Sequence, residues 1–199
     1  MKKAILLTAV VSVLVITQTF TCFGGKTPEQ ALMPKINKVI DMLREAGPIE
    51  KGELKHKDIY PVVESAFDFR ILSMLSLGTN WKRFSGNQKN EFTDLFSRLV
   101  TKIYLEKVEG QDLQDIKVEY DKTEDVESGA NRAEIHTFVY HDSTETPVVY
   151  RMILKSGEWK VYDVVIEGVS MVGNYREQYR KKMFESPESL INDLREKIE

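Results

Sequence analysis

The sequence predicts an α+β fold in which an N-terminal helical lobe packs on a curved, mostly antiparallel sheet and helices end the chain. Over residues 28–109, approximately, apolar side chains recur at intervals of three and four, the period of an amphipathic helix. After Gly110 the interval changes to two and holds over about 113–167, as in half-buried strands. Helical spacing returns over 170–199. Helices, then consecutive strands, then helices is an α+β order rather than an alternating one.

The N-terminal helices carry recognisable start and stop signals. The first is expected to begin at Thr27-Pro28, because threonine can cap it and proline suits the first helical position. Gly47-Pro48 should end it. A second helix is expected from about Asp58, and Asp68 can cap a third from Phe69 to Leu77.

The long helix predicted from Asn87 to Val108 has the clearest periodicity in the chain. Ser85 and Gln88 form a capping-box pattern at its start. Its apolar residues form one continuous face: Phe92, Leu95, Phe96, Leu99, Val100, Ile103 and Tyr104.

Four segments have the alternation of strands: Ile116–Tyr120, Ala133–Tyr140, Val148–Leu154 and Trp159–Ile166. Ser156-Gly157 is a tight hairpin turn between the last two. Short polar connections between consecutive strands favour an antiparallel sheet.

The segment after the last strand changes from extended to helical. Glu167-Gly168 is interpreted as a turn, and Ser170 as the cap of a helix reaching about Phe184. A final helix is expected to start at Ser186-Pro187. Ser170 is therefore interpreted as a structural residue rather than a nucleophile.

The N-terminus has the order of a secretory signal. Two lysines precede the apolar run Ala4–Ile16, and small polar residues follow it. Thirteen residues span about 20 Å as a helix, short of the roughly 30 Å bilayer core, so a retained anchor is the weaker alternative. We expect residues 1–21 to be a signal peptide and 22–199 to be a single domain. Cys22 stands where a bacterial lipoprotein is lipidated, although the residues before it match that signal poorly.

Few residues in the sequence are arranged for catalysis or for binding metal or nucleic acid. A net charge of −3 gives no reason to expect nucleic acid. His136 and His141 point to opposite faces by strand parity, so we expect no metal site, and no cofactor motif is present. Asp163 interrupts an apolar strand, either as a carboxylate facing a cavity or as an outward or edge-facing one hydrogen-bonded to a turn.

Several short motifs resemble, in order and spacing, those of the MlaC family, also called toluene-tolerance proteins. Phe67-Asp68-Phe69 is followed by Leu77-Gly78-Thr79-Asn80-Trp81. Tyr162-Asp163-Val164 precedes Ile166-Glu167-Gly168-Val169-Ser170, and Asn174-Tyr175-Arg176 comes next. The resemblance covers residues from about 30 to 185.

The resemblance implies a periplasmic phospholipid carrier with an NTF2-like arrangement of sheet and helices. It implies no enzymatic activity and no cofactor. The partners it implies are an MCE-domain subunit of an inner-membrane ABC transporter and an outer-membrane lipoprotein/porin complex. Two alternatives stay open: an NTF2-like enzyme for a small apolar substrate, with Asp163 or His136 as general base, and a structural envelope protein with a filled interior.

An acyl-chain pocket between the long helix and the sheet is the site we expect. A filled core is the alternative for each residue. The predicted wall consists of Phe96, Leu99, Val100, Ile103 and Tyr104 from the helix, and of Ile135, Val139, Met152, Leu154, Val161 and Val165 from the strands.

Overall fold

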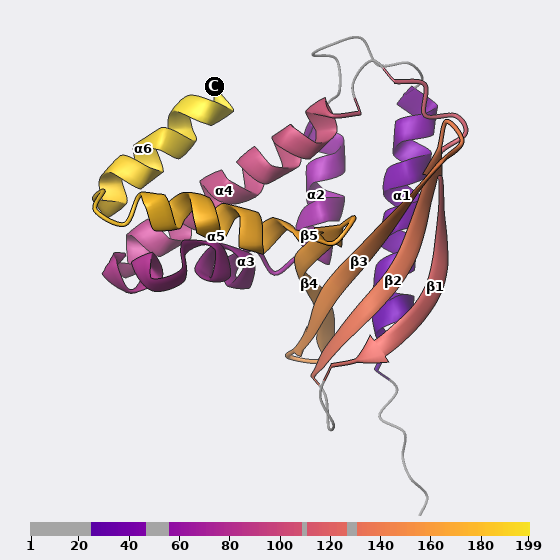
Figure 1. Cartoon of the computed structure of the whole chain (residues 1–199), viewed down its shortest axis with the longest axis horizontal. Coiled ribbons are helices and arrows are strands. Elements are labelled where there is room, and N and C mark those ends of the chain that lie inside the picture. The colour runs from indigo at the N-terminus through magenta and orange to yellow at the C-terminus, as the bar shows by residue number, and fades with distance from the viewer. Residues whose placement is uncertain (1–24, 47–55, 109–110, 127–130) are drawn as a thin grey trace, which may run out of the picture.

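The computed structural model describes residues 25–46, 56–108, 111–126 and 131–199. These residues form one antiparallel sheet with helices against one of its faces and at one end (Figure 1). The predicted signal peptide and Cys22 lie outside the described residues. None of the helices described is long and apolar enough to cross a membrane. The predicted order of helices, strands and helices is confirmed.

The helices fall into two groups. Helices α1 and α2 lie against the sheet, α1 contacting β1, β2 and β4, and this side is called the inner face. The helical lobe, made of α3 to α6 and the 3-10 turn η1, extends from the β4 end of the sheet (Figure 1). The bounds are α1 Pro28–Ala46, α2 His56–Ala66, α3 Phe69–Leu77, η1 Gly78–Arg83, α4 Gly86–Glu106, α5 Met171–Lys181 and α6 Pro187–Ile198.

The sheet is a meander with the order β1-β2-β3-β4-β5, each strand antiparallel to the next. Two-residue turns with positive φ at both positions join β2 to β3, β3 to β4 and β4 to β5. Such turns match the twist of paired strands. The predicted turn Ser156-Gly157 is one of them, with φ of 52° and 83°. The bounds are β1 Lys117–Asp125, β2 Arg132–His141, β3 Thr144–Lys155, β4 Glu158–Ile166 and β5 Val169–Ser170.

The predicted helix caps are present as hydrogen bonds. The Gln30 amide donates to Thr27 Oγ1 at 3.2 Å, and the Ile71 amide donates to Asp68 Oδ1 at 2.9 Å. Ser85 forms the complete capping box before α4. The hydroxyls of Ser170 and Ser186 accept from backbone amides at the starts of α5 and α6. Local side-chain chemistry therefore fixes where these helices begin.

A bulge in β4 changes which side chains face inward. Tyr150 and Met152 share one face of β3, yet their partners on β4 are Val164 and Val161. The extra residue lies between these two partners, so strict alternation fails beyond Tyr162. The prediction that Val165 shares a face with Val161 is therefore wrong, because Val165 pairs with Val149 on the outer face.

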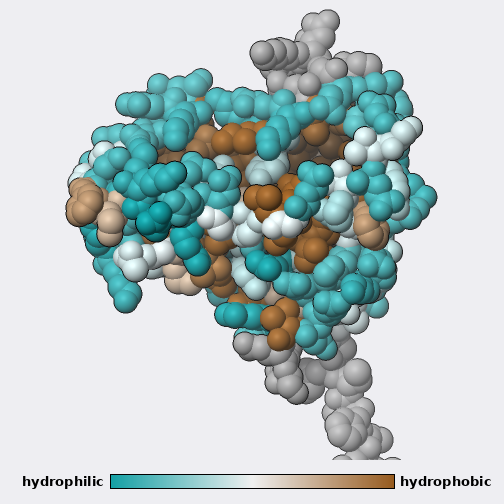
Figure 2. All heavy atoms as spheres, viewed as in Figure 1, coloured by the Kyte–Doolittle hydropathy of each residue, from teal (hydrophilic) through white to brown (hydrophobic). Residues whose placement is uncertain are grey.

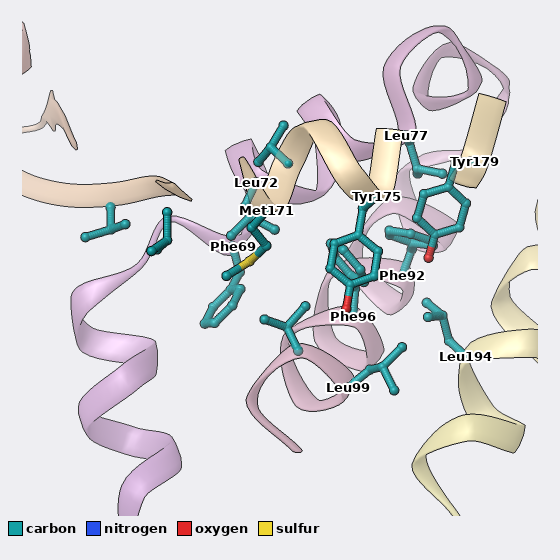
Figure 3. Packing of buried hydrophobic residues seen from close by; sticks show 14 of the residues in the cluster. Phe69, Leu72, Leu77, Phe92, Phe96, Leu99, Met171, Tyr175, Tyr179 and Leu194 are labelled. Carbon is teal, nitrogen blue, oxygen red and sulfur yellow. The ribbon is translucent and has the colours of Figure 1, made fainter. Parts of the chain in front are cut away.

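The apolar face of α4 is covered mainly by the C-terminal helices. Phe96 lies 4.8 Å from the ring of Tyr175, and Phe92 lies 5.5 Å from the ring of Tyr179. Figure 3 shows both tyrosines of α5 directed at these phenylalanines, and Leu99 directed toward Leu194 of α6. We expected the strands to cover the apolar face of α4. This expectation was wrong, because the tyrosine rings of α5 and the leucines of α6 bury most of that face.

Candidate functional site

A hollow lies between the inner face of the sheet and the helices that face it. Figure 2 shows the surface indented between α2 and α4 on one side and the strands on the other, with brown apolar residues in the indentation and teal residues around it. A protein of this size usually closes its apolar interior to native packing density. Apolar walls open to the surface are typical of a ligand site.

The burial of individual side chains supports this interpretation. The described apolar core consists of two clusters, a large one running from the sheet into the helical lobe and a small one made of Leu43, Ile59, Leu105 and Leu113. Val63 of α2 contacts both. Several apolar residues around these clusters stay half-buried although they lie on elements that pack together: Ile36, Val39, Val63, Ile103, Tyr104, Val139, Tyr150 and Ile166.

The residues predicted for the pocket wall differ in how deeply the structure buries them. Ile103, Tyr104 and Val139 are half-buried and contact the large cluster. Leu154 lies opposite Trp159 near the end of β3, and Val165 is on the outer face. The remaining six are buried within the large cluster: Phe96, Leu99, Val100, Ile135, Met152 and Val161. Ile135 and Val161 are fully buried, as is Phe96. The structure thus brings nine of the eleven into or against one cluster.

Five residues of this half-buried set were not in the predicted wall. Tyr150 and Ile166 belong to the same inner face as Val139, while Ile36 and Val39 come from α1 and Val63 comes from α2. Tyr150 lies between Val148 and Met152 in the alternation of β3, so its position was available from the sequence. The contributions of α1 and α2 depend on how these helices dock, for which the sequence has no direct signal.

Three tyrosines on the elements around the hollow have phenol groups with raised pKa values. Burial raises the pKa of Tyr150 to about 12. Burial also raises the pKa of Tyr175 to about 12, with Tyr104 nearby as a smaller cause. The pKa of Tyr104 is raised by burial and then by the charge of Asp163. The Lys107 ammonium lies 4.8 Å from the centre of the Tyr104 ring. These phenols stay neutral near pH 7 and suit an apolar ligand better than a charged one.

Asp163 fastens β4 to the start of α5. Its Oδ2 accepts from the Ser170 hydroxyl at 2.6 Å and from Arg151 Nη1 at 3.1 Å, and its Oδ1 accepts from the Val172 amide at 3.0 Å. Its side chain is only 3% exposed. Of the two interpretations of Asp163, the structure supports the carboxylate hydrogen-bonded at a turn, with the side chain buried rather than outward.

Two groups of described residues combine a histidine with two carboxylates. His136 Nε2 lies 3.5 Å from Glu124 and 3.8 Å from Glu134. His141 presents Nδ1 to Asp115 at 2.7 Å and Nε2 to Asp142 at 3.6 Å. In both groups one ligand atom from each residue lies within 4.8 Å of the others, and such exposed acidic groups are common without a metal ion. Glu134 is already paired with Arg151 at 2.9 Å. The absence of a metal site stays a prediction.

The Asp115 contact predicts a pH effect on stability. Asp115 accepts from the Asp142 amide and pairs with His141, and these bonds, the backbone one first, hold its pKa below the usual 3.8. A carboxyl with a lowered folded-state pKa stabilises the protein above its unfolded pKa and loses this contribution as pH falls through the folded value. Between about pH 5 and pH 3, urea denaturation should show a larger loss of stability for the wild type than for Asp115→Asn. Parallel curves for the two proteins would contradict this.

A second depression, of about 390 Å³, lies between α2, α3, α4 and β4. Its lining is mixed in charge, and several of its polar groups are already partnered. Tyr60 bonds Ser97 at 2.6 Å, Arg70 bonds Asn90 at 2.9 Å, and Asp94 pairs with Arg98. This depression is therefore less suited to an acyl chain than the apolar hollow.

Comparison with known proteins gives concordant results. A family model described as MlaC protein matches residues 34–196. The intermembrane phospholipid transport system binding protein MlaC of Haemophilus influenzae is 33% identical over 101 residues, 48% of this chain and 45% of that protein. The matched part thus spans less than half of that relative.

A solved structure shares the fold. The phospholipid-binding protein from Ralstonia solanacearum, in complex with a phospholipid, superposes with a TM-score of 0.73 over 87% of this chain and 97% of that chain. The sequences are 16% identical, so the likeness concerns the arrangement of helices and strands.

Proposed function

The chain belongs to the MlaC family, and from this premise we propose that it is a phospholipid carrier whose apolar hollow holds acyl chains. The observation that carries the proposal is the set of half-buried apolar side chains between the sheet and the helices. The sequence relative and the solved structure are both named for phospholipid binding or transport, which supports the same ligand class.

The energetics favour a carrier of this kind. Each buried CH₂ contributes about 0.8 kcal/mol, so an exposed acyl chain costs on the order of 10 kcal/mol in water. A hollow walled by Ile103, Val139 and neighbouring apolar groups offers the chain surroundings similar to those of a membrane. Binding and release then involve little net free energy, and the direction of transfer must come from partners.

The enzyme alternative finds little support in the residues that would carry it. Asp163 accepts hydrogen bonds from three donors, so it serves α5 rather than a substrate. His136 lies on the outer face of the sheet, pairing across to Val149 and away from the hollow. A general base must reach the proton that it removes, and neither residue borders the hollow.

The proposed location is the periplasm, with residues 1–21 as the export signal. We propose that the carrier exchanges lipid with an MCE-domain subunit of an inner-membrane ABC transporter and with an outer-membrane lipoprotein/porin complex. A lipid on Cys22 would make transfer a tethered handover rather than free diffusion. The family supports these partners as a class.

Lipid content tests the proposal directly. The exported form of the chain should contain phospholipid after purification, because the hollow is more favourable for acyl chains than water. Organic extraction followed by mass spectrometry should find phospholipid in an amount comparable to the protein. After delipidation, incubation with phospholipid vesicles and re-isolation should restore that amount.

A protein of similar size without an apolar hollow, purified alongside, controls for carry-over from cell membranes. Protein that is empty after purification and also fails to take lipid from vesicles would refute the carrier function. Release of other apolar molecules in place of phospholipid would assign the hollow to a different ligand.

A further inference from the structure

The connection between α5 and α6 exposes two large apolar side chains. Phe184 is 92% exposed and Met183 is 49% exposed, whereas Tyr179 before them and Leu190 after them belong to the large core cluster. In Figure 1 this connection is the convex tip of the helical lobe farthest from the sheet, and Figure 2 shows tan apolar surface there within a teal region. Single exposed apolar side chains are common on protein surfaces, so this pair gains significance only from how it is held and from the charges around it.

The connection is held in place by η1. Arg83 donates from Nη1 to the Met183 carbonyl at 2.6 Å and from Nη2 to the Glu185 carbonyl at 2.8 Å. Arg83 itself is oriented by Asn80, and Asn80 donates to the Tyr179 carbonyl at 3.0 Å. Asn80 is only 3% exposed. These bonds fix the backbone on both sides of Phe184, so the exposed ring is presented from a defined turn.

Cations surround the exposed pair. Arg180-Lys181-Lys182 comes just before Met183, and Lys82-Arg83 lies beside it in η1. The acidic groups nearby are partly used, since Glu177 pairs with Arg180, and Asp193 and Glu185 pair with Lys182. Lys181 and Lys82 form no ion pair within the described part of the chain. This tip is therefore locally basic on a chain whose net charge is −3.

We propose that this tip, Lys82-Arg83 together with Arg180–Phe184, docks the protein on a bilayer that contains anionic phospholipid. Phe184 and Met183 would enter the headgroup region while Lys82 and Lys181, unpaired among the described residues, approach the lipid phosphates. Anionic lipid is the complementary partner because both the apolar and the basic parts of the tip find a match there. A standard protein interface needs about 800 Å² on each side around an apolar centre, and a convex turn with two apolar side chains offers less.

This docking goes beyond carrying a lipid, because it places the carrier at a membrane whether or not its hollow is filled. The tip lies at the opposite end of the molecule from the sheet (Figure 1). A docked molecule would therefore keep its sheet and hollow accessible to another protein.

Vesicle co-sedimentation tests the docking. The exported chain with Cys22→Ser, which removes any lipid anchor, is mixed with vesicles of phosphatidylethanolamine and phosphatidylglycerol or of phosphatidylcholine alone. We expect binding to the anionic vesicles that is at least about tenfold tighter and weakens with salt. Met183→Ser/Phe184→Ser should weaken it about tenfold or more, because the apolar insertion is lost. Lys82→Gln/Lys181→Gln, which removes the two cations of the tip that form no ion pair with any described residue, should weaken it similarly and reduce the salt dependence.

Matched substitutions elsewhere are the controls. Val126→Ser changes another exposed apolar residue, at the end of β1, and Lys38→Gln/Lys117→Gln removes two exposed cations far from the tip. These should bind vesicles like the wild type, and circular dichroism should show all variants folded. Binding no stronger to anionic than to neutral vesicles, or equal losses in tip and control variants, would overturn the docking. Lipid extracted from the same preparations reports separately on the carrier function.

Discussion

Replacing Asp163 with alanine is expected to destabilise the fold by about 3 kcal/mol, which corresponds to a fall in Tm of about 6–12 °C for a chain of this length. The substitution removes the acceptor for Ser170, Arg151 and the Val172 amide at once. The Val172 amide is buried, so it would lose its partner without gaining water. A negative charge at the start of α5 is lost as well. Urea denaturation followed by circular dichroism measures the effect.

Glu134→Ala is the matched control for this prediction. It removes the other carboxylate bound by Arg151, at 2.9 Å, and leaves every bond of Asp163 to α5 unchanged. Because Glu134 is partly exposed, we expect a loss of only about 1 kcal/mol. Equal losses for the two variants would mean that the Arg151 pair, rather than the α5 anchor, is the important contact.

Placing a carboxylate in the hollow should abolish lipid binding. Val139→Asp puts a charge among half-buried apolar groups on the inner face, where an acyl chain would have to contact it. We expect the extracted phospholipid to fall at least about tenfold, since desolvating the carboxylate costs more than the chain gains there. Val139 is only half-buried, so the protein should still fold.

Val165→Asp makes the same chemical change on the other face of the same sheet. Val165 is also half-buried, but the bulge in β4 directs it outward beside Val149. Lipid content close to that of the wild type is the expected result, with Tm reported for both variants. If Val165→Asp empties the protein as completely as Val139→Asp, the hollow is not the lipid site proposed.

Several helix starts and turns could be predicted because local chemistry sets them, whereas β1 continues to Asp125, past the predicted Tyr120, and α5 ends at Lys181 rather than at about Phe184. Asp68 and Ser170 cap helices through their own side chains, and Ser156-Gly157 supplies the positive φ values that its turn requires. Each of these signals acts within three or four residues, so a single sequence carries it in full. The change of apolar period near Gly110 likewise separates helices from strands.

The composition of the site depends on contacts between distant segments, which the sequence determines less directly. The long helix was expected to face the strands, yet tyrosines and leucines some 80 to 95 residues later cover much of its apolar face. Whether the strands or the C-terminal helices cover α4, the same residues of α4 lie in apolar surroundings, so the helical periodicity could not distinguish the two arrangements. One extra residue in β4 was enough to reverse the direction of Val165. The half-buried residues of α1 and α2 likewise become visible only when these helices are docked on the sheet.

The covering of α4 by α5 and α6 also has a consequence for how the chain acquires its structure. The strands of the meander are neighbours in sequence, so their pairing closes only short loops and can begin early. By contrast, α4 meets α6 across about a hundred residues, as in the ion pair between Glu91 and Arg195. A chain delivered N-terminus first would therefore expose Phe92 and Phe96 until its last segment arrived, and this uncovered helix would be the part most prone to aggregate.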